Sequence, residues 1–210
     1  MSPTVFVVDD DAALREALVQ LLEAAGLQVE NFPDGQSFLT AFVADRPGCL
    51  LLDVAMPGMT GLEVQAALTA RGVQIPVVFL TGHGDIPMAV RAVWAGAVDF
   101  LEKPMTGQAL LERVHRALAL DQERRHAQAL NHGVAERARR LSQREREVMA
   151  LVVAGSSSKE VARLLGISVR TVEAHRTHVM HKMGATNLAE LVGMAVHCEL
   201  GLSPGPTPPT

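Results

Sequence analysis

The stretch Thr4-Val-Phe-Val-Val-Asp-Asp-Asp11 joins a short apolar run to a cluster of acids, and the same arrangement recurs along the front half of the chain. Apolar runs also lead directly to Asp53 and Thr81, and another ends shortly before Lys103. If these runs are parallel strands, the polar residues meet at the carboxyl edge of one sheet, where open α/β sheets bind their ligands. The pattern therefore predicts a single site that is assembled from distant segments.

The predicted site combines acids, a hydroxyl and an amine. Crowded carboxylates repel one another unless a cation lies among them, and carboxylate oxygens at a small site suit Mg²⁺. Asp9, Asp10 and Asp53 are therefore candidate Mg²⁺ ligands. One of these acids can then act as a nucleophile toward phosphorus.

Strands alternate with amphipathic helices in residues 1–120, which are predicted to form one domain. Leucines at helical spacing follow the acidic cluster, and Gly26 is expected to end that helix. The Asp34-Gly35 and Pro57-Gly58 pairs mark turns before further apolar helices. This alternation predicts five βα units, which form a parallel sheet with helices on both faces and right-handed crossovers, a small doubly wound domain.

The composition changes after residue 120. Residues 121–140 are polar and helix-favouring with a thin apolar stripe, which predicts a helical linker. Residues 141–200 fit three or four short helices, and the Pro-rich residues 201–210 are expected to be disordered. The net charge of the chain is −4, but residues 1–120 carry a net negative charge and residues 121–210 a net positive one. This asymmetry suggests different partners for the two parts.

Residues 156–182 predict a helix-turn-helix, in which Gly166 ends the first helix and Ser168 caps the second. In this motif the second helix enters the major groove of DNA, with its amino-terminal residues at the base edges. Glu173, Ala174 and Thr177 share one face of that helix. Glutamate can accept a hydrogen bond from cytosine N4, and alanine or the threonine methyl can contact the thymine methyl.

Basic residues flank this face and are candidates for phosphate contacts, which give salt-dependent affinity without sequence information. The alternative is an ordinary solvated face of an amphipathic helix. The candidate DNA-binding residues are Lys159, Arg170, Thr171, Glu173, Ala174, Arg176, Thr177, His178 and Lys182.

Cys49 and Cys198 are isolated and offer neither a metal-ligand nor a disulfide pattern, which fits a reducing compartment. The first residues show no charged start followed by an apolar stretch, and no apolar run approaches the roughly 18 residues that span a bilayer. We therefore expect a cytoplasmic protein without a membrane partner.

Four ordered blocks resemble the receiver domains of two-component response regulators: Val7–Asp11, Leu51–Gly61, Thr81–Val90 and Ala95–Pro104. The segment Leu141–Val148, together with the helix-turn-helix, resembles the LuxR-type DNA-binding domain. Together they resemble the FixJ-like branch of the NarL/FixJ family over nearly the whole chain. The resemblance implies a flavodoxin/CheY-like receiver with a five-stranded parallel sheet, followed by an all-α DNA-binding domain.

The resemblance also implies roles for the residues at the sheet edge. Asp53 matches the phosphoacceptor of the family, and the hydroxyl and amine match the groups that contact the phosphoryl oxygens. The residues implied to handle the phosphoryl group are Asp53, Thr81 and Lys103, and those implied to hold Mg²⁺ are Asp9, Asp10, Asp53 and the backbone carbonyl of Ala55.

Three further features have expected local roles. Asp11 is expected to cap the helix that begins near Ala12. The Lys103–Pro104 bond is a candidate cis peptide, because a tertiary amide lowers the cis penalty to about 0.5–1 kcal/mol. The resemblance implies that Phe100 turns inward when Thr81 moves toward the phosphoryl group, and the alternative is a constant core phenylalanine.

Two surfaces are candidates for dimerisation. Val90 and Trp94, at i and i+4 on one helix, are expected to form an exposed apolar pair, with Arg91 pairing to an acid of a second copy. The alternative packs Trp94 against its own domain. The last helix, residues 188–196, resembles the DNA-bound dimer contact of the family, with simple core packing as the alternative.

The resemblance has departures in the rear domain. Ser158 stands where many LuxR-type domains have Asn, and Glu173 and Thr177 replace basic residues of some relatives. DNA targets can therefore not be transferred from those relatives.

These features predict a response regulator that a cognate histidine kinase phosphorylates on Asp53, and that then dimerises and binds a double-stranded DNA operator to regulate transcription, with activation favoured. RNA polymerase is a further candidate partner. The protein is not expected to be an enzyme, apart from the Mg²⁺-dependent phosphotransfer and dephosphorylation of its own receiver. One rival hypothesis is a phosphohydrolase that uses Asp9, Asp10 and Asp11 as a catalytic loop, and another is a DNA-binding protein whose receiver is never phosphorylated.

Overall fold

The computed structural model describes residues 2–82 and 98–197. The chain divides into two compact units, Met1–Arg125 and His126–Thr210, and each is described by itself. The candidate dimer residues Val90, Arg91 and Trp94 and the tail 201–210 lie outside the described residues. No helix in the described part of the chain is both long and apolar enough to cross a bilayer.

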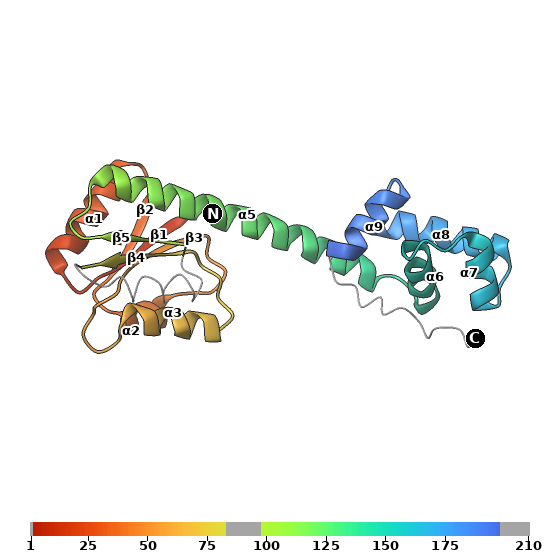
Figure 1. Cartoon of the computed structure of the whole chain (residues 1–210), viewed down its shortest axis with the longest axis horizontal. Coiled ribbons are helices and arrows are strands. Elements are labelled where there is room, and N and C mark those ends of the chain that lie inside the picture. Colours follow the sequence, from red (N-terminus) through yellow and green to blue (C-terminus); the bar gives the residue numbers. More distant parts are fainter. Residues whose placement is uncertain (1, 83–97, 198–210) are drawn as a thin grey trace. The chain divides into compact units, whose positions relative to one another are not determined.

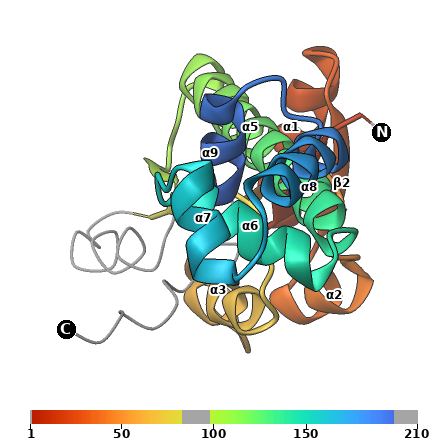
Figure 2. The same ribbon diagram turned by 90° about the vertical axis from the view of Figure 1, so that its right-hand side faces the viewer.

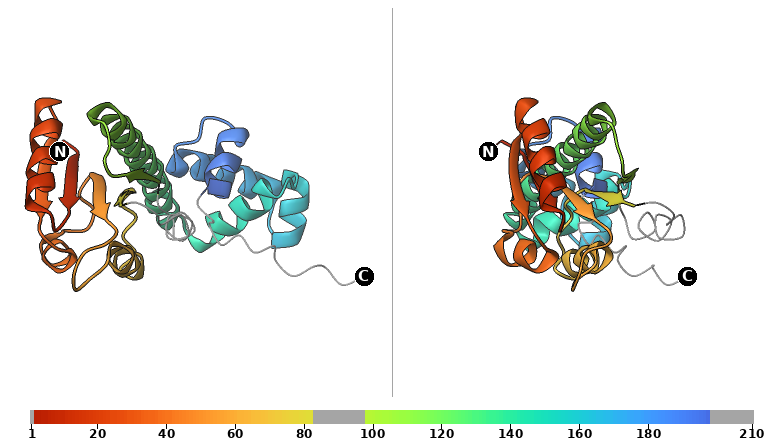
Figure 3. Two further views of the ribbon diagram at one scale, coloured as in Figure 1. Left: turned by 60° about the vertical axis from the view of Figure 1, so that its left-hand side comes forward. Right: turned by 90° about the vertical axis from the view of Figure 1, so that its left-hand side faces the viewer.

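The first unit is a five-stranded parallel sheet in the order β2-β1-β3-β4-β5, as the alternating pattern predicted (Figure 1). Its helices lie on both faces, with α1 and α5 on one side and α2 and α3 on the other (Figures 1 and 3). The strands are β1 Thr4–Val8, β2 Gln28–Phe32, β3 Gly48–Asp53, β4 Val77–Thr81 and β5 Asp99–Glu102, and the helices that precede α5 are α1 Ala12–Ala24, α2 Gly35–Ala41 and α3 Gly61–Ala70.

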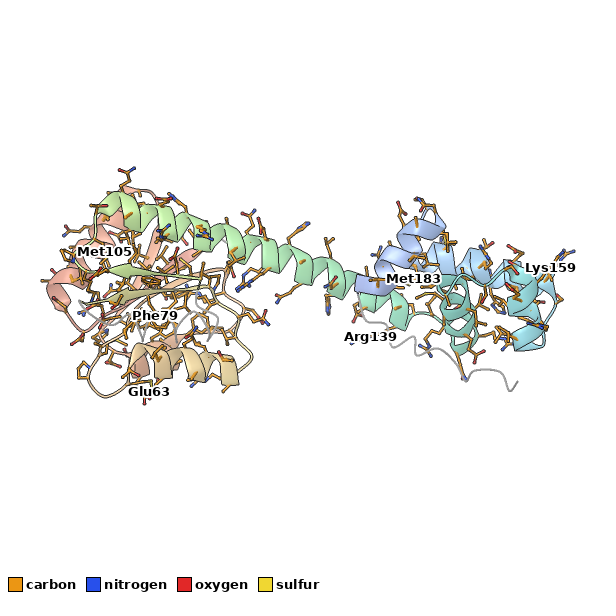
Figure 4. The ribbon with its side chains drawn as sticks, in the orientation of Figure 1. Glu63, Phe79, Met105, Arg139, Lys159 and Met183 are labelled. Atoms are coloured by element: carbon orange, nitrogen blue, oxygen red, sulfur yellow. The ribbon has the colours of Figure 1, made fainter. Side chains whose placement is uncertain are left out.

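The central strand β3 is buried along its whole length, which explains its uninterrupted apolar sequence. Successive side chains of a strand point to opposite faces, so β3 contributes to two cores. Cys49 and Leu51 pack with α1 and α5, whereas Leu50 and Leu52 pack with α2 and α3. Phe79 of the adjacent strand β4 lies in the second of these cores and is fully buried (Figure 4).

A single helix, α5 (Gly107–Arg139), carries the chain from the first unit into the second. Its front part packs on the sheet through Leu110 and Val114, and its end contributes Val134 and Ala138 to the core of the second unit. The predicted linker 121–140 is therefore helical up to Arg139 and is continuous with the last helix of the first unit.

The second unit contains α6 (Gln143–Val153), α7 (Ser158–Leu165), α8 (Val169–Met183) and α9 (Leu188–His197) (Figure 2). Its helix ends follow local sequence signals. Ser142 and Ser157 form capping boxes at the starts of α6 and α7, and Ser168 caps α8 through the N–H of Thr171. Gly166 and Gly184 end α7 and α8 in the left-handed conformation. The pair α7 and α8 forms the predicted helix-turn-helix.

Candidate functional site

The sheet brings the predicted site residues to one edge. In the parallel register Val8 of β1 pairs with Leu52 of β3, so Asp9 and Asp53 follow at the same level. Thr81 ends β4 at the level of Glu102 on β5, and Lys103 comes next in the chain. The four segments therefore meet as the positions of their apolar runs predicted.

Lys103 joins two acids at this edge. Its Nζ lies 2.7 Å from Asp9 Oδ2 and 2.6 Å from Asp53 Oδ1. The Asp9 residue is fully buried and Asp53 is 5% exposed, so the amine bridges two carboxylates that have little contact with solvent. A charge-assisted hydrogen bond is strong in such a setting, and it fixes the three groups relative to one another.

Burial and the neighbouring charges shift the pKa values of Asp53 and Lys103 in opposite directions. Burial raises the pKa of the Asp53 carboxyl above its ordinary value, although the hydrogen bond from Lys103 opposes the shift. Burial acts to lower the pKa of Lys103, but the hydrogen bonds to Asp53 and Asp9 outweigh it, and the net shift is upward. Lys103 is therefore a cation at neutral pH.

The carboxylates at this edge fit a hard cation. One oxygen each from Asp9, Asp10 and Asp53 can be chosen so that all three lie within 4.8 Å of one another. Such an all-oxygen donor set suits Mg²⁺. Ala55 lies beside the cluster, because its backbone N–H donates to Asp53 Oδ2 at 3.1 Å.

Thr81 and Phe100 lie on the adjacent strands β4 and β5, and no hydrogen bond between Thr81 and Asp53 is among those of the described residues. The Thr81 hydroxyl donates to the Gly82 carbonyl at 2.9 Å, and its backbone carbonyl accepts the N–H of Lys103 at 2.7 Å. Phe100 is 44% exposed, so in this structure it is neither a fully buried core residue nor turned inward.

Two local expectations are confirmed. Asp11 caps α1, because its side chain accepts the N–H groups of Ala13 and Leu14. The Lys103–Pro104 peptide bond is cis.

Sequence reasoning missed two residues that shape the site. Arg15 donates from Nη1 to the carbonyl oxygen of Asp9 at 2.8 Å. Gly61 begins α3 so close to β3 that a Cβ atom there would lie 2.3 Å from the carbonyl oxygen of Asp53. A basic residue in the first turn after the acidic cluster was the signal that could have identified Arg15. The Gly61 contact joins distant parts of the backbone, and no sequence pattern marks it.

The second unit presents the predicted base-reading face to solvent. Glu173, Ala174 and Thr177 are exposed on α8, while Val172 and Val179 on its other side are buried. Arg170 and His178 are also exposed on α8, and Lys159 projects from α7 (Figure 4). The arrangement of these side chains agrees with an amphipathic helix that has one solvated face.

Two of the candidate phosphate contacts have partners within the unit. Lys182 Nζ lies 2.6 Å from Glu145 Oε2 at the start of α6. Arg176 donates from Nη1 to the Ser158 hydroxyl at 3.2 Å, and its Nε lies 3.9 Å from the Glu173 carboxylate. These two cations link helices of the domain to each other, whereas Arg170 is exposed.

The last helix is divided between core and surface. Leu191 and Ala195 are buried in the core of the second unit, so the core-packing alternative holds for them. Leu188 and Val196 are 42% and 68% exposed.

The first unit therefore carries an acidic site at the carboxyl edge of its parallel sheet, and the second contains a helix-turn-helix. Residues 5–115 match the family model described as response regulator receiver domain. Residues 139–195 match the one described as bacterial regulatory proteins, luxR family. The chain belongs to the two-component response regulators with a LuxR-type DNA-binding domain, a family of transcription regulators.

Relatives extend this assignment over nearly the whole chain. The transcriptional regulatory protein TdiR of Thauera aromatica is 44% identical over 208 residues, which cover 97% of this chain and 92% of that protein. The transcriptional regulatory protein FixJ of Azorhizobium caulinodans is 46% identical and covers 91% of each chain. Among solved structures, the response regulator StyR has a TM-score of 0.83 at 45% identity, over 93% of this chain and 99% of that one.

Proposed function

We propose that this regulator accepts a phosphoryl group on Asp53 from a cognate histidine kinase, and that phosphorylation promotes dimerisation and DNA binding to activate transcription. The observation that carries the proposal is the Lys103 ammonium, which lies between Asp9 and Asp53 at 2.7 and 2.6 Å beside a cluster of three carboxylates. A carboxylate nucleophile, a fixed cation and an acidic cation site are the groups that suit phosphoryl transfer to an aspartate.

The residues have distinct parts in the transfer. A carboxylate oxygen of Asp53 forms a bond to phosphorus as the bond from phosphorus to the imidazole nitrogen of the kinase breaks, and the leaving nitrogen keeps the electron pair. Lys103 balances charge on the phosphoryl oxygens. Asp9, Asp10, Asp53 and the carbonyl of Ala55 would hold Mg²⁺, which would further compensate the charge on the transferred group.

The phosphoryl group then changes the neighbouring segment. It adds about −1.5 to −2 charges and several strong acceptors. The Thr81 hydroxyl, which donates to Gly82 in this structure, moves to the new acceptor, and Phe100 leaves its exposed position for an inward one. This shift is the signal that favours the dimer, with Val90, Arg91 and Trp94 at its interface.

In DNA binding, α8 enters the major groove. Its exposed residues Glu173, Ala174 and Thr177 meet base edges, while Lys159, Arg170 and His178 contact phosphates. A symmetric dimer places two such helices on a two-fold operator. RNA polymerase is the partner through which a bound dimer would activate transcription.

The geometry disfavours the phosphohydrolase. Asp11 uses its side chain to cap α1, and the Asp9 carboxylate is held by Lys103 and by the N–H of Asp11. With its side chain engaged in the cap, Asp11, the second acid of an Asp-x-Asp loop, is not free to protonate a leaving group.

The proposal is tested by selecting bound duplexes from a random DNA pool with the full chain, before and after treatment with acetyl phosphate and Mg²⁺. Enrichment of a two-fold sequence only by the phosphorylated protein supports it, and Asp53→Asn should lose this dependence. Equal enrichment by treated wild type and treated Asp53→Asn would instead identify a DNA-binding protein whose receiver is not controlled by phosphate.

A further inference from the structure

Arg15 connects the acidic loop to the neighbouring strand. It stands in the first turn of α1, and its Nη1 donates to the carbonyl oxygen of Asp9 at 2.8 Å. Its Nε donates to Asn31 Oδ1 at 3.3 Å, and Asn31 lies on β2 opposite Val7 of β1. One guanidinium therefore holds the peptide after Asp9 against the edge of the sheet.

The peptide that Arg15 holds leads directly into Asp10. The Asp9 carboxylate is fixed by Lys103 and by the N–H of Asp11, at 2.7 and 2.9 Å. The exposed Asp10 carboxylate, in contrast, accepts no hydrogen bond from residues 2–82 or 98–197. The backbone sets the direction in which its Cα–Cβ bond leaves the chain, and the carbonyl of Asp9 belongs to the peptide unit that leads into Asp10.

We propose that Arg15 is a positioning residue of the Mg²⁺ site, anchored by Asn31, which orients the Asp9–Asp10 peptide so that the Asp10 carboxylate faces Asp53. The inference rests on the proposed function, because it concerns the cation of the same site. Removal of a partner that orients the ligands of a metal typically lowers the metal affinity by about 10- to 100-fold.

The direction in which removal of Arg15 changes the Mg²⁺ affinity distinguishes a positioning role from a purely electrostatic one. As a cation in contact with the backbone of the acidic loop, Arg15 repels a second cation bound there, so its removal should tighten Mg²⁺ binding if charge were its only effect. If Arg15 positions Asp10, its removal weakens binding instead.

The experiment is calorimetric titration of the full chain with Mg²⁺ alone. We expect Arg15→Ala to weaken binding about tenfold, the lower end of the cost of losing such a partner. Asn31→Ala, which removes the anchor without changing the charge, should weaken binding in the same direction by less. The matched control is Arg124→Ala, an exposed arginine that lines a cavity at the start of β4, at the opposite end of the strand from the site.

Phosphorylation gives a second readout. At saturating Mg²⁺ the rate with acetyl phosphate should return to that of the wild type in Arg15→Ala, because only the cation affinity has changed. Mg²⁺ binding by Arg15→Ala that equals or exceeds that of the wild type would overturn the inference, as would an unchanged affinity in Asn31→Ala. A wild-type chain that binds no Mg²⁺ would overturn the cation site of the proposed function, and the inference with it.

Discussion

Lys182 near the end of α8 donates a 2.6 Å hydrogen bond to the Glu145 carboxylate in the first turn of α6. The Glu145 side chain is 5% exposed, and it also accepts the backbone N–H of Ser142. The contact fixes the proposed recognition helix to the start of the domain. It gives Lys182 a partner within the domain, whereas the position of Lys182 on the helix predicts a contact with a DNA phosphate.

Lys182→Met should destabilise the second unit by about 1–2 kcal/mol, because it leaves the Glu145 carboxylate without its cation while the partly exposed ammonium limits the loss. Hydrogen exchange of amides in α8 measures the change locally. Arg170→Ala, which removes an exposed cation from the same helix, serves as the control and should leave this protection unchanged. Equal protection in Lys182→Met and the wild type would contradict the structural role.

Arg170→Ala should instead weaken binding to the selected DNA. The loss of one phosphate contact reduces the slope of log K against log salt concentration by about one for each protomer. Fluorescence anisotropy at several salt concentrations measures this slope. Glu173→Ala, at the base-reading face, is the comparison, since it should change the preferred sequence and leave the slope nearly constant. A slope unaltered by Arg170→Ala would exclude that phosphate contact.

The second unit should lose stability in acid through Glu145. The Lys182 ammonium, and next the Ser142 N–H, lower the pKa of Glu145 to about 2 from an ordinary 4.5. A depressed carboxyl pKa contributes stability that is complete above the unfolded value and is lost as pH falls from about 4.5 through about 2.

Glu145→Gln tests this because glutamine can keep the capping box but has no charge. The stability difference between wild type and Glu145→Gln, from urea unfolding, should shrink between pH 5 and pH 3. Glu160→Gln, at the exposed capping box of α7, is the matched control and should show a smaller change. A stability difference between wild type and Glu145→Gln that stays constant with pH would contradict the contribution of the Glu145 carboxylate.

Asp121 joins α5 to the start of β3. Its carboxylate accepts the buried N–H of Gly48 at 2.9 Å and Arg125 Nε at 2.8 Å. Asp121→Ala leaves this N–H without an acceptor, so we expect a loss of about 2 kcal/mol in the first unit. Hydrogen exchange of peptides that include Gly48 measures it, with the exposed Glu123→Ala on the same helix as control. Equal hydrogen exchange of the Gly48 peptides in Asp121→Ala and Glu123→Ala would contradict the role of Asp121 as their anchor.

Features with local causes were predictable from the sequence. The ends of β1, β3 and β4 follow from apolar runs that stop at a polar residue, and the caps at Asp11 and Ser168 follow from residue type and spacing. A parallel sheet then places the strand ends together without further information.

Features that depend on long-range contacts were not predictable. Lys182 and Arg170 are similar as residues on an amphipathic helix, and only the fold brings Glu145 to one of them. The Arg15 contact depends on how α1 leaves the sheet, and the exposure of Phe100 depends on the packing around β5. The predicted linker could not be seen as an extension of α5, because its polar composition differs from that of the packed part of the helix.

The central claim is that Asp53 accepts the phosphoryl group and that this drives dimerisation. The most direct measurement is the intact mass of the full chain after incubation with acetyl phosphate and Mg²⁺, for wild type and Asp53→Asn, with sedimentation of the same samples. We predict a single phosphoryl addition and a shift to dimer in the wild type, and neither in Asp53→Asn. Phosphoryl addition that persists in Asp53→Asn, or a wild type that is phosphorylated without any change in sedimentation, would contradict this account.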